Sequence, residues 1–150
     1  MSIAIWPMRR HELLVGFFQD IAINPGSPHH IEFVKDTKNL DVSTQGAIIA
    51  HNHTYGEEGT NVNFVEVVED REIQVRTFER GVENETLSCG TGVTAAALAA
   101  FSAGKVTNSK IEVHTLGGDL TVSFTPSDKG FSDIVLTGPT EFVFSGTLEV

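Results

Sequence analysis

Cys89 is the only cysteine in the chain, and it opens the tetrapeptide Cys-Gly-Thr-Gly at residues 89–92. The small apolar segment 93–101 follows directly and predicts a helix. A thiol at the start of a helix lies where backbone N–H groups and the helix dipole stabilise negative charge. That position lowers a thiol pKa below its usual value of roughly 8.5, and the two glycines let the backbone approach an anion closely. The tetrapeptide therefore indicates a reactive thiol beside an anion site, while a buried structural cysteine before an ordinary helix fits it equally well.

The composition is that of an acidic globular protein, and 150 residues fit one domain, 1–150. A formal net charge of −10 argues against nucleic acid or an anionic membrane surface as a partner. A single cysteine excludes an intrachain disulfide and fits a reducing compartment. Because we find no segment that resembles a signal peptide or a membrane span, we expect a soluble, cytoplasmic protein.

The distribution of apolar residues predicts many short strands and few helices. We expect one or two strands within residues 13–23, and further strands at 31–34, 61–68, 72–78, 111–115, 120–125, 132–137 and 141–145. Residues 24–28 form a dense cluster of turn residues and predict a loop. A short helix is expected over 41–50 with Asp41 or Ser43 as its cap, and residues 1–12 are a possible mobile lead-in.

The helix predicted after Cys89 has no polar face, because Thr94 is the most polar residue of segment 93–101. A helix that is apolar all round is normally surrounded by protein. We therefore expect an α+β fold in which a mainly antiparallel, barrel-like sheet wraps around one central apolar helix. This arrangement would place Cys89 at one rim of the barrel.

Three segments resemble the C-terminal half of diaminopimelate epimerase. These are Glu-Arg-Gly-Val-Glu-Asn-Glu-Thr-Leu-Ser-Cys-Gly-Thr-Gly at 79–92, Gly-Ser-Pro-His-His at 26–30 and Gly-Thr-Asn-Val-Asn-Phe at 59–64. The resemblance covers roughly residues 20–150 and implies the lobe fold of these isomerases. It also implies their reaction, the interconversion of LL- and meso-diaminopimelate in lysine and peptidoglycan precursor biosynthesis. These enzymes use two thiols on opposite faces of the substrate, without pyridoxal phosphate, metal or other cofactor.

The resemblance assigns catalytic roles to three residues. Cys89 would be the thiol of the second half of the enzyme, and Glu79 would lie beside it and help to set its proton affinity. His29 would do the same for the cysteine of the other lobe. Without the resemblance, Glu79 at a strand end could equally belong to a solvent-exposed ion pair, and His29 in a proline loop could be structural.

The substrate, a small diamino dicarboxylic acid, would be held by a second, overlapping set of residues. Asn61, Glu79 and Arg80 would bind its polar groups, since an arginine can clamp a carboxylate with two parallel hydrogen bonds. The backbone N–H groups of Gly90 and Thr91 would bind a carboxylate at the start of the helix.

Two departures from the family pattern bear on activity. Nothing in residues 1–30 resembles the cysteine turn of the family's N-terminal lobe, so we expect the chain to be inactive alone. Its expected partner is that missing lobe or a second copy in a homodimer. Residues 141–150 would be a strand that normally pairs with the absent lobe, which would leave an unpaired edge. Ser27 stands where the family often has an asparagine.

Three other functions remain open at this point. One is a related racemase or isomerase of the proline-racemase or phenazine-isomerase type, against which segments 79–81 and 28–29 argue. Another is a lobe that binds an amino-acid-like ligand without turning it over. A hydrolase with a nucleophilic thiol is the third, and it would form a covalent adduct that a proton-transfer cysteine should not.

Overall fold

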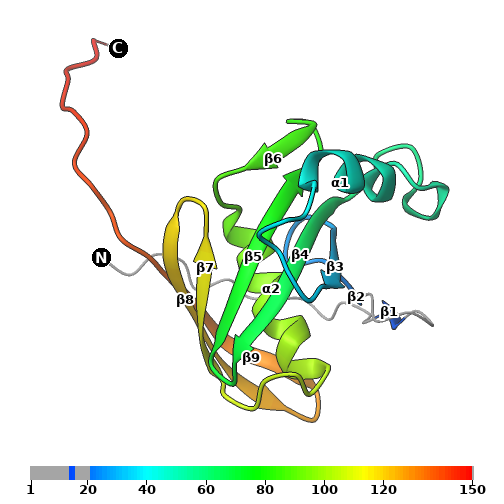
Figure 1. Cartoon of the computed structure of the whole chain (residues 1–150). Coiled ribbons are helices and arrows are strands. Elements are labelled where there is room, and N and C mark those ends of the chain that lie inside the picture. The colour runs from blue at the N-terminus through cyan, green and yellow to red at the C-terminus, as the bar shows by residue number, and fades with distance from the viewer. Residues whose placement is uncertain (1–13, 16–20, 150) are drawn as a thin grey trace.

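One curved sheet and two α-helices make up the structure, a computed structural model that describes residues 14–15 and 21–149 (Figure 1). The strands are β1 (Leu14–Val15), β2 (Ile21–Ile23), β3 (His29–Phe33), β4 (Asn61–Glu69), β5 (Glu72–Glu79), β6 (Asn84–Thr86), β7 (Lys110–Thr115), β8 (Gly118–Ser127) and β9 (Gly130–Thr137). The helices are α1 (Val42–Ala50), the short 3-10 helix η1 (His53–Tyr55) and α2 (Gly90–Ser102). None of the helices in the described part of the chain is long and apolar enough to cross a membrane.

The strands form a single sheet in the order β1-β2-β3-β4-β5-β7-β8-β9, with β6 paired to one part of β5. Neighbouring strands are antiparallel except in the pairs β3–β4 and β5–β7, which are parallel. The sheet curls around α2 as an open half-barrel (Figure 1). This confirms the expected α+β fold, a mainly antiparallel sheet around one apolar helix.

Helix α2 fills the concave side of the sheet. Eight of its residues are buried, most of them alanines, and they pack with Ile31, Val65 and Ile73 from three strands. Small side chains let the helix axis approach the sheet closely, which explains why a helix without a polar face is stable here.

Helix α1 covers the opposite face of β4 and β5. Its side chains Val42 and Ala50 pack on Phe64 and Phe78, and a Cβ on Gly46 would collide with Phe78. Of the two expected caps, Asp41 is the one used, because its carboxylate accepts a hydrogen bond from the N–H of Thr44 at 3.1 Å.

Most of the predicted elements are present, with small differences at their ends. The predicted strand 31–34 begins earlier, at residue 29, because it pairs with β4 from its first residue. The sequence missed β6 and η1, which are three residues long each. The predicted lead-in, 1–12, lies outside the described residues, as do residues 13 and 16–20 of the region predicted to hold one or two strands.

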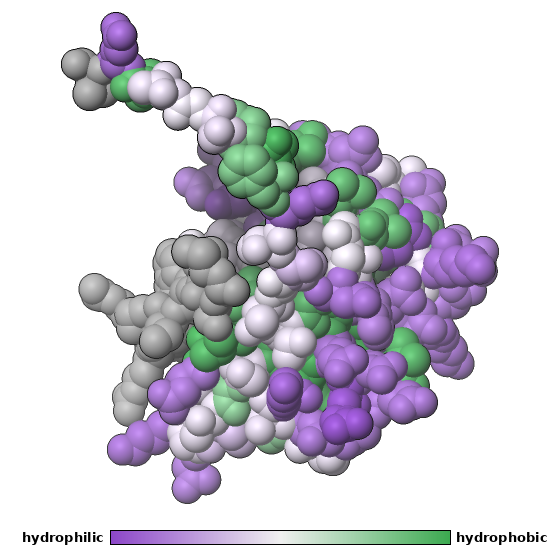
Figure 2. Space-filling view, turned by 90° about the vertical axis from the view of Figure 1, so that its left-hand side faces the viewer, coloured by the Kyte–Doolittle hydropathy of each residue, from purple (hydrophilic) through white to green (hydrophobic). Residues whose placement is uncertain are grey.

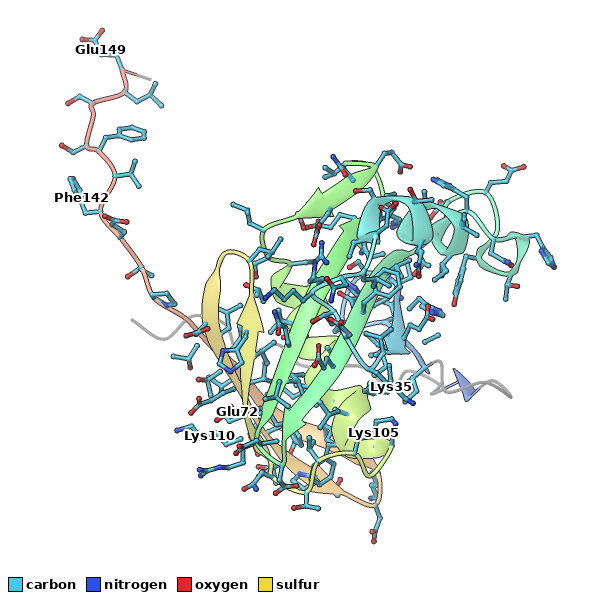
Figure 3. All side chains as sticks on the ribbon, in the orientation of Figure 1. Lys35, Glu72, Lys105, Lys110, Phe142 and Glu149 are labelled. Atoms are coloured by element: carbon cyan, nitrogen blue, oxygen red, sulfur yellow. The ribbon has the colours of Figure 1, made fainter. Side chains whose placement is uncertain are left out.

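The predicted strand at 141–145 is wrong for this chain. Residues 138–149 adopt no regular secondary structure, and they extend away from the sheet (Figures 1 and 3). Phe142, Val143, Phe144 and Leu148 are each 80–83% exposed. A strand needs a partner for its backbone N–H and C=O groups, and among the described residues no strand lies beside this segment.

Candidate active site

Four elements bring the predicted site residues to one end of the half-barrel. His29 and Asn61 are the first residues of the parallel strands β3 and β4, and they lie opposite each other in the register. Strand β5 runs antiparallel to β4 and therefore ends there, at Glu79. Helix α2 begins at the same end, directly after Cys89.

The His29 imidazole is buried at the centre of this cluster, with 1% of the residue exposed. Its Nε2 lies 3.0 Å from the Ser27 hydroxyl and 3.0 Å from the Thr91 hydroxyl. Burial and the nearby positive charge of Arg80 lower the pKa of His29 from 6.5 to about 4, since both disfavour the imidazolium ion. The ring is therefore neutral at pH 7.

Cys89 is the N-cap residue of α2, as the sequence predicted. Its backbone is extended and its side chain makes no cap hydrogen bond, so the partly exposed thiol stays available at the helix start. Sγ lies 3.5 Å from the Thr91 hydroxyl, which in turn contacts His29. The first N–H groups of a helix have no acceptor within the helix, so the N–H groups of Gly90 and Thr91 are suited to binding an anion beside the thiol.

Asn61 connects the proline loop to the end of β5. Its Oδ1 accepts a hydrogen bond from the N–H of Arg80 at 3.1 Å. Its Nδ2 donates to the carbonyl of Pro28 at 3.3 Å and to the hydroxyl of Ser27 at 3.4 Å. Arg80 itself extends towards a neighbouring loop, where Nη1 donates to the carbonyl of Glu58 at 3.1 Å. The loop, the strand end and the arginine therefore form one connected unit.

Glu79, at the end of β5, is held by a hydrogen bond from β6. Its Oε1 accepts a hydrogen bond from the Thr86 hydroxyl, on β6, at 2.6 Å. Within residues 21–149 no hydrogen bond joins Glu79 to Cys89. The predicted influence of Glu79 on the proton affinity of Cys89 stays a prediction.

Two buried polar residues of this cluster, Asn63 and Thr77, were not predicted from the sequence. Nδ2 of Asn63 lies 3.0 Å from Nδ1 of His29, and Oδ1 accepts a hydrogen bond from the Thr77 hydroxyl at 3.0 Å. The sequence contained one indication that Asn63 belongs to the site. Asparagine is depleted in strands, yet β4 carries Asn61 and Asn63 at alternate positions, which places both on the same face.

Two further side chains belong to the site, although neither was predicted from the sequence. Ser27, which was left out of the predicted site, contacts both His29 and Asn61. Thr91 was predicted to act through its backbone, and the structure also brings its hydroxyl between His29 and Cys89. Among the described residues, no group of three or more His, Cys, Asp or Glu side chains has an arrangement that could hold a metal ion.

Several known proteins are similar in sequence to this chain. The family model described as diaminopimelate epimerase matches residues 21–143. The chain is 45% identical over 128 residues to the diaminopimelate epimerase of Flavobacterium psychrophilum, covering 85% of this chain and 50% of that protein. It is 44% identical over 140 residues to the enzyme of Chlorobaculum tepidum, covering 93% of this chain and 53% of that one. The chain thus spans about half the length of the curated relatives it matches.

A solved structure supports the fold independently. A phenazine biosynthesis protein of the PhzF family from Enterococcus faecalis superposes with a TM-score of 0.51 at 21% sequence identity, covering 65% of this chain and 34% of that one. At this identity the likeness concerns the fold alone. Because the family model matches most of the chain, and curated relatives are up to 45% identical to it, the chain belongs to the diaminopimelate epimerase family.

Proposed function

We propose that this chain is one catalytic lobe of a cofactor-independent amino-acid epimerase that interconverts LL- and meso-diaminopimelate. The observation that carries the proposal is the position of Cys89, which is the N-cap of α2 and is joined through Thr91 to the buried His29. Family membership supports the same reaction.

In the proposed reaction, a thiolate on one face of the substrate removes the α-proton. A thiol on the opposite face donates a proton to the same carbon, so the configuration inverts with no net gain or loss of atoms or electrons. Cys89 supplies one of these two thiols. The other comes from a complementary lobe, since this chain has one cysteine and spans about half the length of its curated relatives.

The start of α2 would bind the carboxylate next to the reacting carbon. The N–H groups of Gly90 and Thr91 point out of the helix start, where the helix dipole favours negative charge. Negative charge develops on this carboxylate as the α-proton leaves, so fixed donors here lower the barrier.

The other end of the substrate would lie towards the end of β5. The Arg80 guanidinium can hold a second carboxylate with two parallel hydrogen bonds. Glu79 would attract an ammonium group, and Asn61, which binds the backbone N–H of Arg80, would hold this end of the site in place.

The C-terminal segment 139–149 would contact the complementary lobe. Figure 2 shows this segment standing clear of the rest of the surface, and its exposed apolar residues include Phe142 and Phe144. Exposed apolar segments with unpaired backbone groups associate readily with other chains. We infer that the segment becomes a strand when its partner, either the second lobe or another copy of this chain, is present.

Hydrogen–deuterium exchange tests the proposal directly. The purified chain is incubated with LL-diaminopimelate in D₂O, alone and together with a separately produced N-terminal lobe from a relative such as the Flavobacterium psychrophilum enzyme. Loss of the α-proton signal is followed by NMR. Cys89→Ala removes the proposed acid–base group, and Ser102→Ala, at the exposed far end of the same helix, is the matched control.

We expect exchange when both lobes are present, its loss in Cys89→Ala and its retention in Ser102→Ala. Exchange by the chain alone that requires Cys89 would refute the need for a second lobe. Exchange that persists in Cys89→Ala would refute the role of the thiol. Formation of a stable covalent adduct on Cys89 would favour the thiol hydrolase instead.

A further inference from the structure

The Asn63 side chain has a fixed orientation deep in the protein. The residue is completely buried, and its Nδ2 lies 3.2 Å from the backbone carbonyl of His30. A carbonyl oxygen can only accept a hydrogen bond, so the amide must direct its NH₂ group to this side. Its Oδ1 accepts a hydrogen bond from the Thr77 hydroxyl on the other side.

The packing of α2 holds this orientation in place. Gly92 lies against the Asn63 amide, and a Cβ on Gly92 would collide with Oδ1. The helix start therefore touches the amide directly, which leaves the side chain little room to rotate. The glycine at this position is explained by close packing on Asn63.

The fixed amide determines where His29 carries its hydrogen. The second N–H of Nδ2 points to Nδ1 of His29 at 3.0 Å, so Nδ1 must accept and cannot carry a hydrogen. A neutral imidazole has one N–H group, which must then be on Nε2. That nitrogen faces the hydroxyls of Ser27 and Thr91.

We propose that Asn63 is a positioning residue that locks His29 in the Nε2–H tautomer and thereby makes its site-facing nitrogen a hydrogen-bond donor. His29 then donates to the Thr91 hydroxyl, which leaves the hydrogen of that hydroxyl free for the sulfur of Cys89, 3.5 Å away. The chain of donors therefore ends at the Cys89 sulfur. The catalytic effect of this tautomer rests on the proposed epimerase function. The tautomer itself does not depend on that function.

The tautomer determines which chemical groups can interact with Nε2 of His29. With a hydrogen on Nε2, the ring stabilises an anion that enters the site, such as a thiolate or a carboxylate. It does not take a proton from that side. The burial and the Arg80 charge that keep the ring neutral also prevent it from becoming a donor at both nitrogens near pH 7.

The tautomer can be measured on this chain without substrate or a second lobe. Long-range ¹H–¹⁵N NMR at pH 7 on uniformly ¹⁵N-labelled protein distinguishes a protonated from an unprotonated ring nitrogen. We expect the Nδ1 signal of His29 in the unprotonated range and the Nε2 signal in the protonated range. A protonated Nδ1 in the unaltered chain would overturn the proposal, whatever the epimerase assay shows.

Two variants test whether Asn63 causes this state. In Asn63→Asp the carboxylate accepts a hydrogen bond from Nδ1, so we expect Nδ1 to become protonated and the pKa of His29 to rise from about 4 by roughly 1–3 pH units. Thr77→Val removes the neighbouring hydroxyl without touching the ring, and we expect the unaltered tautomer. The signals of His51 and His114, which lie outside the cluster, are internal controls.

Retention of the Nε2–H tautomer in a folded Asn63→Asp would overturn the role of Asn63. A change of tautomer in Thr77→Val as well would also contradict it, because any disturbance of the pocket would then suffice. Should Asn63→Asp fail to fold, the measurement on the unaltered chain still decides whether Nδ1 accepts. If NMR confirms the tautomer but no deuterium exchange occurs with both lobes present, the proposed function is refuted and the tautomer proposal stands.

Discussion

Gly92→Ala should destabilise this protein, although alanine is a better helix former than glycine. Gly92 lies in the first turn of α2, where the added Cβ would collide with Oδ1 of Asn63 and come within 3.3 Å of Cβ of Cys89. Asn63 cannot move without weakening its hydrogen bonds to Thr77 and His29. The substitution therefore has two opposing effects on stability. The higher helix propensity of alanine stabilises α2, and crowding in the buried polar cluster destabilises the protein.

The expected magnitude follows from three contributions. Overpacking a buried site costs about 1–3 kcal/mol, and each weakened hydrogen bond adds about 1 kcal/mol at most. The higher helix propensity of alanine returns up to about 1 kcal/mol. The weakened hydrogen bonds and the higher helix propensity roughly cancel, so the net loss is the overpacking cost, about 1–3 kcal/mol in the free energy of unfolding. With a denaturant slope of roughly 2 kcal/mol per molar urea, the unfolding midpoint falls by about 0.5–1.5 M.

Gly90→Ala is the matched control, because it lies in the same helical turn. Its Cβ would meet the far end of the Leu136 side chain at 3.2 Å, which can move at little cost. Urea unfolding followed by circular dichroism should show a midpoint at or above that of the unaltered chain for Gly90→Ala and a clearly lower one for Gly92→Ala. Equal midpoints for the two variants would refute the inferred contact between α2 and Asn63.

Three further predictions concern stability and association. Arg76 binds the Glu85 carboxylate with two hydrogen bonds of 2.6 and 2.7 Å at a mostly buried position. Arg76→Met should therefore lower the free energy of unfolding by about 2–4 kcal/mol. A loss below about 1 kcal/mol in urea unfolding would contradict this. A hydrogen bond to Asp119 raises the pKa of His114, so its contribution to stability is complete below pH ~6.5 and is lost as the pH rises through the raised value. Since this pair is partly exposed, His114→Gln should lower stability by less than about 1 kcal/mol at pH 5.5 and have no effect at pH 8.5; an equal effect at both pH values would exclude the ion pair as the cause. Deletion of residues 139–150 should leave the melting temperature of the chain unchanged. It should weaken the binding of the chain to a complementary lobe, as measured by calorimetry. A lower melting temperature would mean that the segment contacts the domain.

The sequence alone was sufficient for features that depend on neighbouring residues. The apolar run after Cys89 predicted a helix surrounded by protein, and α2 is buried on the concave side of the sheet. The alternation in 72–78 and the polar break at 69–71 predicted the hairpin of β4 and β5. The position of Cys89 at the start of a helix followed from the same local pattern, because capping and turn formation involve residues close in the chain.

The family resemblance predicted a set of site residues, and the structure brings most of them to one end of the half-barrel, but the sequence did not predict their contacts. The hydrogen bond from Thr86 to Glu79, for example, was not predicted. The strand predicted at 141–145 had the right composition, but it has no partner strand among the residues that the structure describes. Composition determines which residues are able to form a strand, and a second strand must be adjacent before one forms.

Only the tertiary structure decided how the polar residues around His29 are connected. The parallel pairing of β3 with β4 brings Asn63 under the imidazole, although 34 positions separate the two residues in the chain. The start of α2 then adds Thr91 from 62 positions away. The sequence thus determined most of the elements and the position of the thiol at a helix start. The proton on His29 was decided by the fold, because hydrogen bonds between distant residues exist only once the sheet has curled around its helix.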